Sequence, residues 1–172
     1  MLIDRIAAAL GSREELERWT LADVAPAAGL SPAGLIKRFG SRAGILRALS
    51  NRWIESIPDG PVGFLAPEEE LRKWVAGRFA GDDPQGIAHG LVNLIDDLVD
   101  ADLRDLLAQG WAKEIRYLAS LITQLKLHNV RDPAAAAAVL FDALNGAMLR
   151  GAAQPDPYDS TRTLDHLMEV WT

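Results

Sequence analysis

One segment of the chain combines many basic side chains with a complete absence of acidic ones. It spans residues 24–54, and its positively charged members are Lys37, Arg38, Arg42, Arg47 and Arg52. The chain as a whole is acidic, with a net charge of −6. Guanidinium and ammonium groups gathered in this way bind phosphate oxygens, so the segment predicts a localised surface for a polyanion.

A second set of polar residues has the spacing of a metal site. The run Asp96-Asp97-Leu98-Val99-Asp100 resembles the D-D-x-x-D sequence with which isoprenoid synthases bind magnesium and diphosphate. Those enzymes need a second metal-binding motif and a larger helical barrel, so a solvated acidic helix end is expected instead. His89, His128 and His166 lack the spacing of metal ligands. The sequence therefore predicts a protein that is not an enzyme and needs no metal or cofactor.

The composition favours a two-domain protein of the cytoplasm. The chain has 172 residues and no Cys, and no apolar run approaches the ~20 residues of a membrane span. Residues 1–57 hold eight basic and six acidic side chains, whereas residues 58–172 hold ten and eighteen. The turn-forming run Pro58-Asp59-Gly60-Pro61 separates these parts. We therefore expect one domain over residues 1–57 and a second over residues 58–172.

The hydrophobic spacing is helical along the whole chain, and alternation typical of strands is nearly absent. It predicts an all-α fold with about nine helices. Their ends are indicated by capping residues, by Pro at the first helical position and by Gly after the last. The expected helices lie near residues 2–10, 21–28, 32–39, 42–57, 71–79, 87–98, 102–127, 133–151 and 160–171, with Thr20, Ser31, Ser41, Asp132 and Ser160 as caps.

Two short helices joined by Gly29-Leu30-Ser31 have the pattern of a helix-turn-helix motif. Leu35 and Phe39 are spaced to face the preceding helix. The second helix of such a motif lies in the major groove of DNA, with its first residues nearest the base edges. A plain helical hairpin is the alternative interpretation. The basic segment and the capped helix that follows favour DNA binding.

The run from Thr20 to Leu49 resembles the DNA-binding region of TetR-family transcriptional regulators. The matching positions are Thr20, Leu21, Val24, Ala25, Ala28, Gly29, Leu30, Ser31, Leu35, Ile36, Phe39, Ser41, Ile45, Leu46 and Leu49. Arg42 stands where the family usually has Lys, so the resemblance implies a phosphate contact there. Three departures are Ile36 at a usually aromatic position, Ala43-Gly44 in place of an acidic start, and Pro26 inside a helix.

These observations define a predicted DNA-binding set. Pro32, Ala33, Gly34 and Ile36 can approach the bases closely, and Lys37 can donate to guanine. Arg38 and Arg42 are placed for phosphates, as are the N–H groups of the helices that begin after Thr20 and Ser41. The full set is Thr20, Leu21, Ser31, Pro32, Ala33, Gly34, Ile36, Lys37, Arg38, Ser41 and Arg42.

The resemblance implies a homodimer whose second domain binds a small effector. The small residues of the helix near 133–151 and the amphipathic helix near 160–171 are suited to close packing in a dimer. A helix buried within the single chain is the alternative interpretation. Few polar groups are available to fix a ligand, so a mostly apolar effector is expected. The predicted pocket residues are Trp74, Phe79, His89, Asn93, Trp111, Tyr117, Phe141 and Asn145. Each of them is equally suited to an ordinary place in the core.

The sequence as a whole predicts a sequence-specific regulator of transcription. The resemblance implies a ligand-responsive repressor that binds a near-palindromic double-stranded operator as a homodimer. Two other classes stay open at this point. One is a helical binding or scaffold protein whose helix-turn-helix no longer binds DNA, and the other is a small helical enzyme that uses the acidic run.

Overall fold

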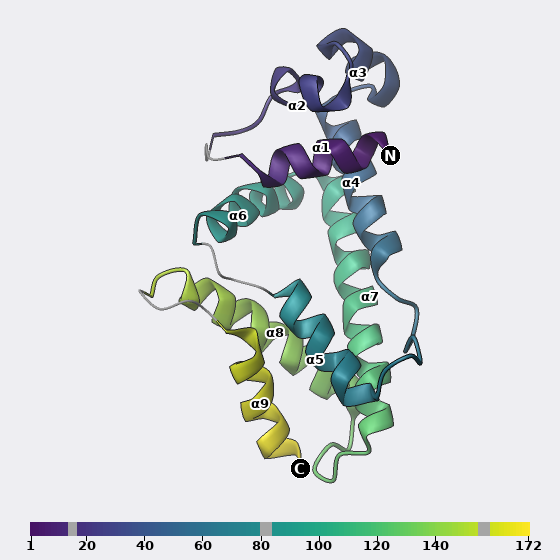
Figure 1. The fold of residues 1–172 in the computed structure, drawn as a ribbon, viewed down its shortest axis with the longest axis vertical. Coiled ribbons are helices and arrows are strands. Elements are labelled where there is room, and N and C mark those ends of the chain that lie inside the picture. Colours follow the sequence, from purple (N-terminus) through teal and green to yellow (C-terminus); the bar gives the residue numbers. More distant parts are fainter. Residues whose placement is uncertain (14–16, 80–83, 155–158) are drawn as a thin grey trace. The chain divides into compact units, whose positions relative to one another are not determined.

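The computed structural model describes residues 1–13, 17–79, 84–154 and 159–172, except for the side chains of Gln85 and His89. Nine helices and no strand occur in these ranges. Figure 1 labels these helices along the chain. They are α1 (Leu2–Gly11), α2 (Leu21–Ala28), α3 (Pro32–Phe39), α4 (Arg42–Ser56), α5 (Pro67–Arg78), α6 (Pro84–Val99), α7 (Ala101–Leu125), α8 (Pro133–Gly151) and α9 (Ser160–Trp171). The predicted all-α class with nine helices is confirmed.

The helix ends follow from local capping chemistry. Gly29 and Gly40 end α2 and α3 with φ of 66° and 77°, a region that side chains other than glycine rarely adopt. The carboxylate of Asp132 accepts the N–H groups of Ala134 and Ala135 at the start of α8. One predicted cap was wrong. Asp159, and not Ser160, caps α9, because its carboxylate accepts the N–H of Thr161 at 2.9 Å.

The chain forms two compact units. The first contains Met1–Ser56 and Ala88–Gly110, and the second contains Ile57–Ile87 and Trp111–Thr172. Helices α6 and α7 therefore each contribute residues to both units. The proposed functional division at residue 57 stays a prediction. No helix among the described residues is long and apolar enough to cross a membrane.

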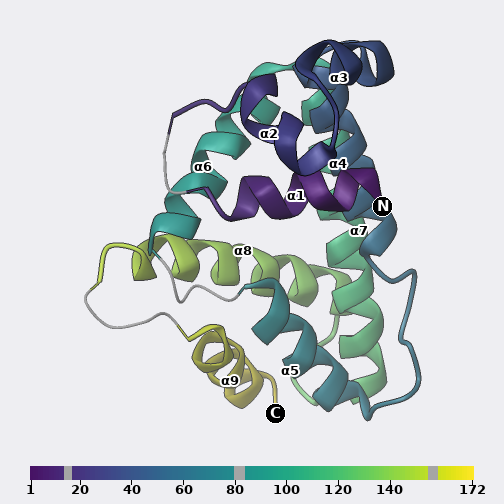
Figure 2. The ribbon, with the colours of Figure 1, turned by 45° about the horizontal axis from the view of Figure 1, so that its top comes forward.

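The core of the first unit lies where α1, α2, α3 and α4 meet. Helix α1 packs against α2 and α4, and α3 packs against the same two helices (Figure 2). The buried members are Ile6, Trp19, Val24, Ala25, Ala28, Leu35, Ile45, Leu46 and Leu103. Pro26 is accommodated inside α2 on its exposed side. The helix-turn-helix is therefore held on a continuous apolar base that includes one residue of α7.

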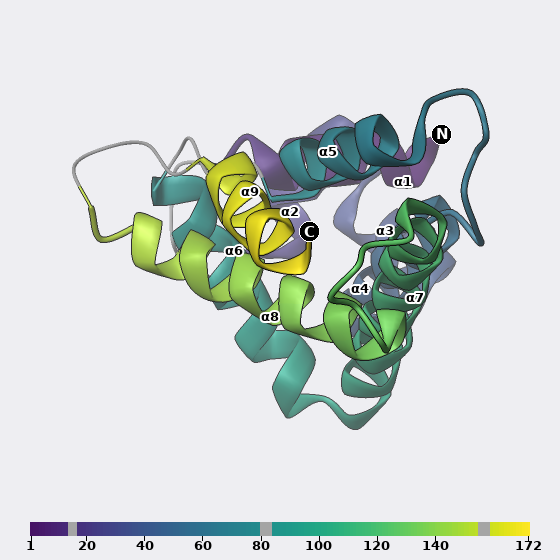
Figure 3. The same cartoon turned by 90° about the horizontal axis from the view of Figure 1, so that it is seen from below.

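In the second unit, α9 packs against both α8 and α5 (Figure 3). The interior of this unit includes two buried carboxylates. Glu70 accepts hydrogen bonds from the hydroxyl of Tyr117 at 2.6 Å and from the N–H of Val62 at 2.8 Å. Glu114, which is fully buried, forms a two-point ion pair with Arg78. Each buried charge thus has a specific partner, as burial requires.

Candidate nucleic-acid interface

Helix α3 presents a short outer face on a firmly anchored motif. The N–H of Gly34 donates to the hydroxyl of the cap Ser31 at 3.1 Å, and Leu35 is completely buried beneath the helix. Gly34 is half-buried. The remaining predicted residues, namely Pro32, Ala33, Ile36, Lys37 and Arg38, are exposed. This arrangement leaves the predicted reading residues available to a large partner.

The five basic residues of the segment 24–54 differ in how they are held. Three are paired within the first unit: Arg42 with Asp96 at 2.6 Å, Arg47 with Asp102 at 3.6 Å, and Arg52 with Asp4. Lys37 and Arg38 are exposed and form no ion pair within the described residues. Of these five residues, the two without an ion-pair partner in the described part of the chain therefore lie on α3, where they are available to bind phosphate.

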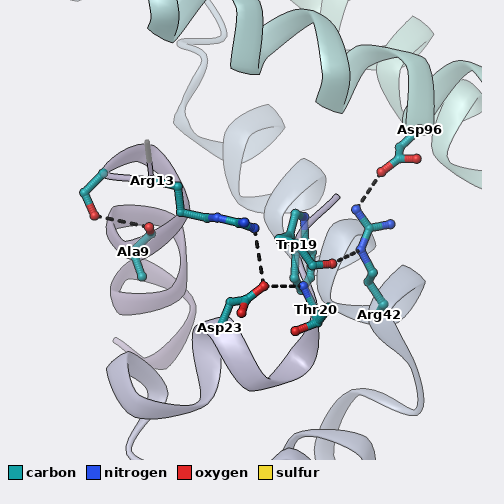
Figure 4. A network of polar contacts seen from close by, with 8 residues as sticks. Ala9, Arg13, Trp19, Thr20, Asp23, Arg42 and Asp96 are labelled. Atoms are coloured by element: carbon teal, nitrogen blue, oxygen red, sulfur yellow. Dashed lines mark hydrogen bonds and ion pairs between the residues drawn. The ribbon is translucent and has the colours of Figure 1, made fainter. Parts of the chain in front are cut away.

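Arg42 is held by three groups at once (Figure 4). Its Nε donates to the carbonyl oxygen of Trp19 at 3.0 Å, and its Nη2 donates to Asp96. The guanidinium also lies over the Trp19 ring, 4.4 Å from the ring centroid. A cation over an aromatic face gains electrostatic attraction. The sequence predicted a phosphate contact for Arg42, and in this structure its side chain contacts Trp19 and Asp96.

The two predicted phosphate-binding helix starts are both exposed and capped. At α2, the N–H of Thr20 donates to the carboxylate of Asp23 at 2.7 Å, and Arg13 also contacts that carboxylate (Figure 4). The hydrogen bond from Thr20 is the main reason that the pKa of Asp23 is lowered. At α4, the N–H of Gly44 donates to the hydroxyl of Ser41 at 3.1 Å. Leu21 is half-buried and packs on the core.

The acidic run at the end of α6 has structural roles. Asp96 pairs with Arg42 and with Arg18, and Asp100 accepts the N–H groups of Asp102 and Leu103 at the start of α7. Within the described residues, no group of three or more metal-ligating side chains is close enough to hold an ion. The run is thus occupied by ion pairing and helix capping.

The predicted pocket residues do not all belong to one unit. Trp74, Phe79, Trp111, Tyr117, Phe141 and Asn145 lie in the second unit. Their rings form edge-on contacts, with centroids 4.8 Å apart for Trp74–Tyr117, 6.0 Å for Phe79–Phe141 and 6.3 Å for Trp111–Phe141. Asn93 belongs to the first unit and is exposed. The side chain of His89 lies outside the described part of the chain.

Sequence reasoning missed two residues that belong to the ion-pair network of Arg42. Asp96 was treated only as part of a solvated run, and Arg18 lies outside the segment 24–54. The position of Arg18, two residues before the helix cap Thr20, is the one sequence signal that could have identified it. No local signal could have found Asp96, because its partner Arg42 lies 54 positions away.

The arrangement of nine helices with a capped helix-turn-helix near the N-terminus defines the class of fold. Solved structures of transcriptional regulators share this arrangement over almost their whole length. A Rhodococcus sp. protein assigned to the TetR family of transcriptional regulators is 23% identical, with a TM-score of 0.67 over 98% of this chain and 93% of that one. The chain thus has a TetR-like fold.

Two further structural neighbours are a regulator that was solved with choline and a repressor of a multidrug efflux pump. A regulator from Saccharomonospora viridis in complex with choline is 16% identical, with a TM-score of 0.66 over 97% of this chain and 93% of that one. SmeT, the repressor of the Stenotrophomonas maltophilia multidrug efflux pump SmeDEF, is 16% identical, with a TM-score of 0.64 over 99% and 88%. SmeT has also been solved with triclosan. No protein-family model and no curated protein matches the sequence.

Proposed function

We propose that this protein is a sequence-specific DNA-binding regulator of transcription. The observation that supports the proposal most directly is the exposed outer face of α3, with Lys37 and Arg38 on it and Leu35 buried beneath. A face of this size enters the major groove of B-form DNA in other helix-turn-helix proteins. The fold shared with TetR-family regulators supports the same conclusion.

The chemistry of that face predicts how bases are read. Lys37 is the single cation placed to donate to guanine O6 or N7. Pro32, Ala33 and Ile36 offer apolar contact to thymine methyl groups and allow close approach. Arg38 neutralises backbone phosphate. Specificity should therefore depend on close fit and DNA shape more than on many hydrogen bonds to bases.

The active form is proposed to be a homodimer assembled through α8 and α9. Val139, Leu149 and Val170 on these helices are large apolar residues that are exposed in the single chain. A two-fold dimer of this kind would place two copies of α3 about 34–36 Å apart, one turn of DNA. The operator would then be a near-palindrome of double-stranded DNA.

The protein is further proposed to be a repressor that responds to a small, mostly apolar effector in the second unit. The aromatic contacts around Trp74 and Phe141 supply apolar surface. Both buried carboxylates there already accept hydrogen bonds within the unit, Glu70 from the hydroxyl of Tyr117 and Glu114 from the guanidinium of Arg78. Choline and triclosan bound to neighbours of this fold support a small-molecule effector. Effector binding would shift α4 and change the separation of the α3 helices, with a coupling of about 1–3 kcal/mol.

Selection of bound duplexes from random DNA, followed by gel-shift titration, tests the proposal. We expect a near-palindromic consensus with two half-sites one turn apart. Lys37→Ala should weaken binding to that consensus. Arg42→Ala should weaken binding and reduce the salt dependence by about one unit per subunit. If no duplex binds at low salt, the protein is a helical binding protein without DNA-binding activity.

A further inference from the structure

The carboxylate of Asp96 bridges two arginines of the first unit. Its Oδ1 lies 3.1 Å from Nη2 of Arg18, and its Oδ2 lies 2.6 Å from Nη2 of Arg42. Asp96 and Arg42 are mostly shielded from solvent, whereas 69% of the Arg18 side chain is exposed. Two guanidinium groups around one anion form a site that a phosphate group would also satisfy.

Arg42 does not depend on Asp96 alone for its position. Its Nε donates to the Trp19 carbonyl oxygen (Figure 4), and its guanidinium carbon lies 4.4 Å from the centroid of the Trp19 ring. A guanidinium has five N–H donors, so these contacts leave its terminal nitrogens free to change partner. Replacing Asp96 by another anion would therefore leave Arg42 where it is.

The site lies between the two helix starts that are predicted to contact the DNA backbone. Arg18 and Trp19 immediately precede Thr20, the cap of α2, and Arg42 immediately follows Ser41, the cap of α4. The 3.0 Å hydrogen bond from Arg42 to Trp19 joins the two starts. A DNA phosphate at this place would meet two arginines beside two helix N-termini.

We propose that Arg18 and Arg42 form a phosphate-binding site that Asp96 fills in the DNA-free protein, and that a DNA phosphate displaces Asp96 from it. The inference rests on the proposed function. Asp96 is an intramolecular competitor of DNA, and it belongs to α6, a helix that continues into the second unit. Because binding couplings are reciprocal, whatever strengthens the Asp96–Arg42 contact weakens DNA binding, and DNA in turn weakens that contact.

The decisive variant is Asp96→Asn, which keeps the shape and a hydrogen-bond acceptor but removes the charge. We expect it to bind duplex DNA roughly 3- to 10-fold more tightly at low salt, the range of a partly exposed ion pair. Its salt dependence should be steeper by up to about one unit per subunit. The probes are the selected operator and an unrelated duplex of equal length, and both should bind the variant more tightly.

Two controls separate competition from general electrostatics. Asp105→Asn removes an equal charge from an exposed residue of the same unit that forms no ion pair among the described residues. It should change affinity much less than Asp96→Asn does. Combining Asp96→Asn with Arg42→Gln should remove most of the gain, because Arg42 makes the shorter of the two contacts with Asp96. Equal effects of the two Asp variants would overturn the inference.

Arg18→Gln tests the same site without altering a buried position. We expect it to weaken binding to both duplexes several-fold and to reduce the salt dependence by about one unit per subunit. Thermal unfolding should show that all variants are folded. If Asp96→Asn binds more weakly than the wild type while remaining folded, Asp96 supports α4 and does not compete with DNA. If the wild type binds neither duplex, the proposed function itself fails and the inference falls with it.

Discussion

Gly44 lies so close to the carbonyl oxygen of Phe39 that a β-carbon at position 44 would stand 1.8 Å from that oxygen. The oxygen belongs to the backbone at the end of α3, and Gly44 lies in the first turn of α4. Glycine is therefore required for the tight passage from α3 into α4. The departure from the TetR-family pattern at Gly44 thus has a steric reason.

Gly44→Ala should accordingly destabilise the first unit by about 2 kcal/mol or more, because a backbone atom must move to admit the methyl group. Chemical unfolding followed by circular dichroism would measure the loss. Gly90→Ala is the matched control, since Gly90 lies on a helix of the same unit and has no atom within 4 Å of the added carbon. That substitution should be neutral or stabilising by up to about 1 kcal/mol. Similar losses in both variants would refute the steric explanation.

The two cations of α3 should have different effects on DNA binding. Lys37→Ala should cost about 1–3 kcal/mol on the selected operator and relax the base preference at one position of each half-site. Arg38→Ala should weaken binding to every duplex and reduce the salt dependence by about one unit per subunit. Arg131→Ala, which removes an exposed cation from the second unit, should change neither quantity. Equal relaxation of specificity by Lys37→Ala and Arg38→Ala would invalidate the assignment of Lys37.

Asp97 should make folding stability depend on pH. Its burial, together with the neighbouring charge of Asp96, raises its pKa from 3.8 to about 6, although Arg42 opposes the shift. The folded state thus binds a proton at Asp97 more tightly than the unfolded chain does. The resulting stability is greatest below pH 3.8 and is lost as the pH rises through about 6.

Asp97→Asn should therefore be more stable than the wild type at pH 7, by roughly 1 kcal/mol after allowance for partial solvent exposure. The difference should shrink as the pH falls below the ordinary carboxyl range. Urea unfolding at a series of pH values measures both effects, with Asp105→Asn as the exposed control. A gain that stays constant across the series would show that Asp97 is not the titrating group.

The hydroxyl of Tyr117 should stabilise the second unit through Glu70. Burial raises the pKa of Glu70, but hydrogen bonds from Tyr117, Val62 and Gly63 outweigh it and leave the pKa below the usual 4.5. This contribution to stability is present above pH 4.5 and is lost as the pH falls through the lowered value. Tyr117→Phe should cost about 1–3 kcal/mol at pH 7 and less in acid. In the Glu70→Gln background the same substitution should cost less, and an equal cost would exclude the proposed interaction.

Assembly through α8 and α9 can be tested with two matched apolar positions. Val139 on α8 and Val62 before α5 are 54% and 53% exposed in the single chain. Light scattering should give a dimer mass for the wild type and for Val62→Glu. Val139→Glu should shift the mass toward the monomer, because a charge would be buried without a partner. A dimer that tolerates both substitutions would place the interface elsewhere.

Much of the fold was predictable because helix ends depend on neighbouring residues. Gly29, Ser31 and Gly40 fixed the ends of α2 and α3, and Asp132-Pro133 fixed the start of α8. The α9 cap was missed because Asp159 and Ser160 are adjacent and both have capping chemistry. The partners of the arginines were not predictable, because Asp96 and Asp102 meet α4 only after the chain has folded.

Leu103 of α7 belongs to the buried core of the first unit, and this limits where the chain can be divided. Leu103 is 2% exposed among the residues of α1 to α4, and the ring of Trp53 on α4 lies where a side chain at Gly110 would be. A fragment cut out at residue 57 would lose the contacts of Leu103 and Gly110 and would leave Arg42 without Asp96. Moving the helix-turn-helix with its core into another protein would require the stretch Ala88–Gly110 as well, because the first unit is discontinuous in the sequence.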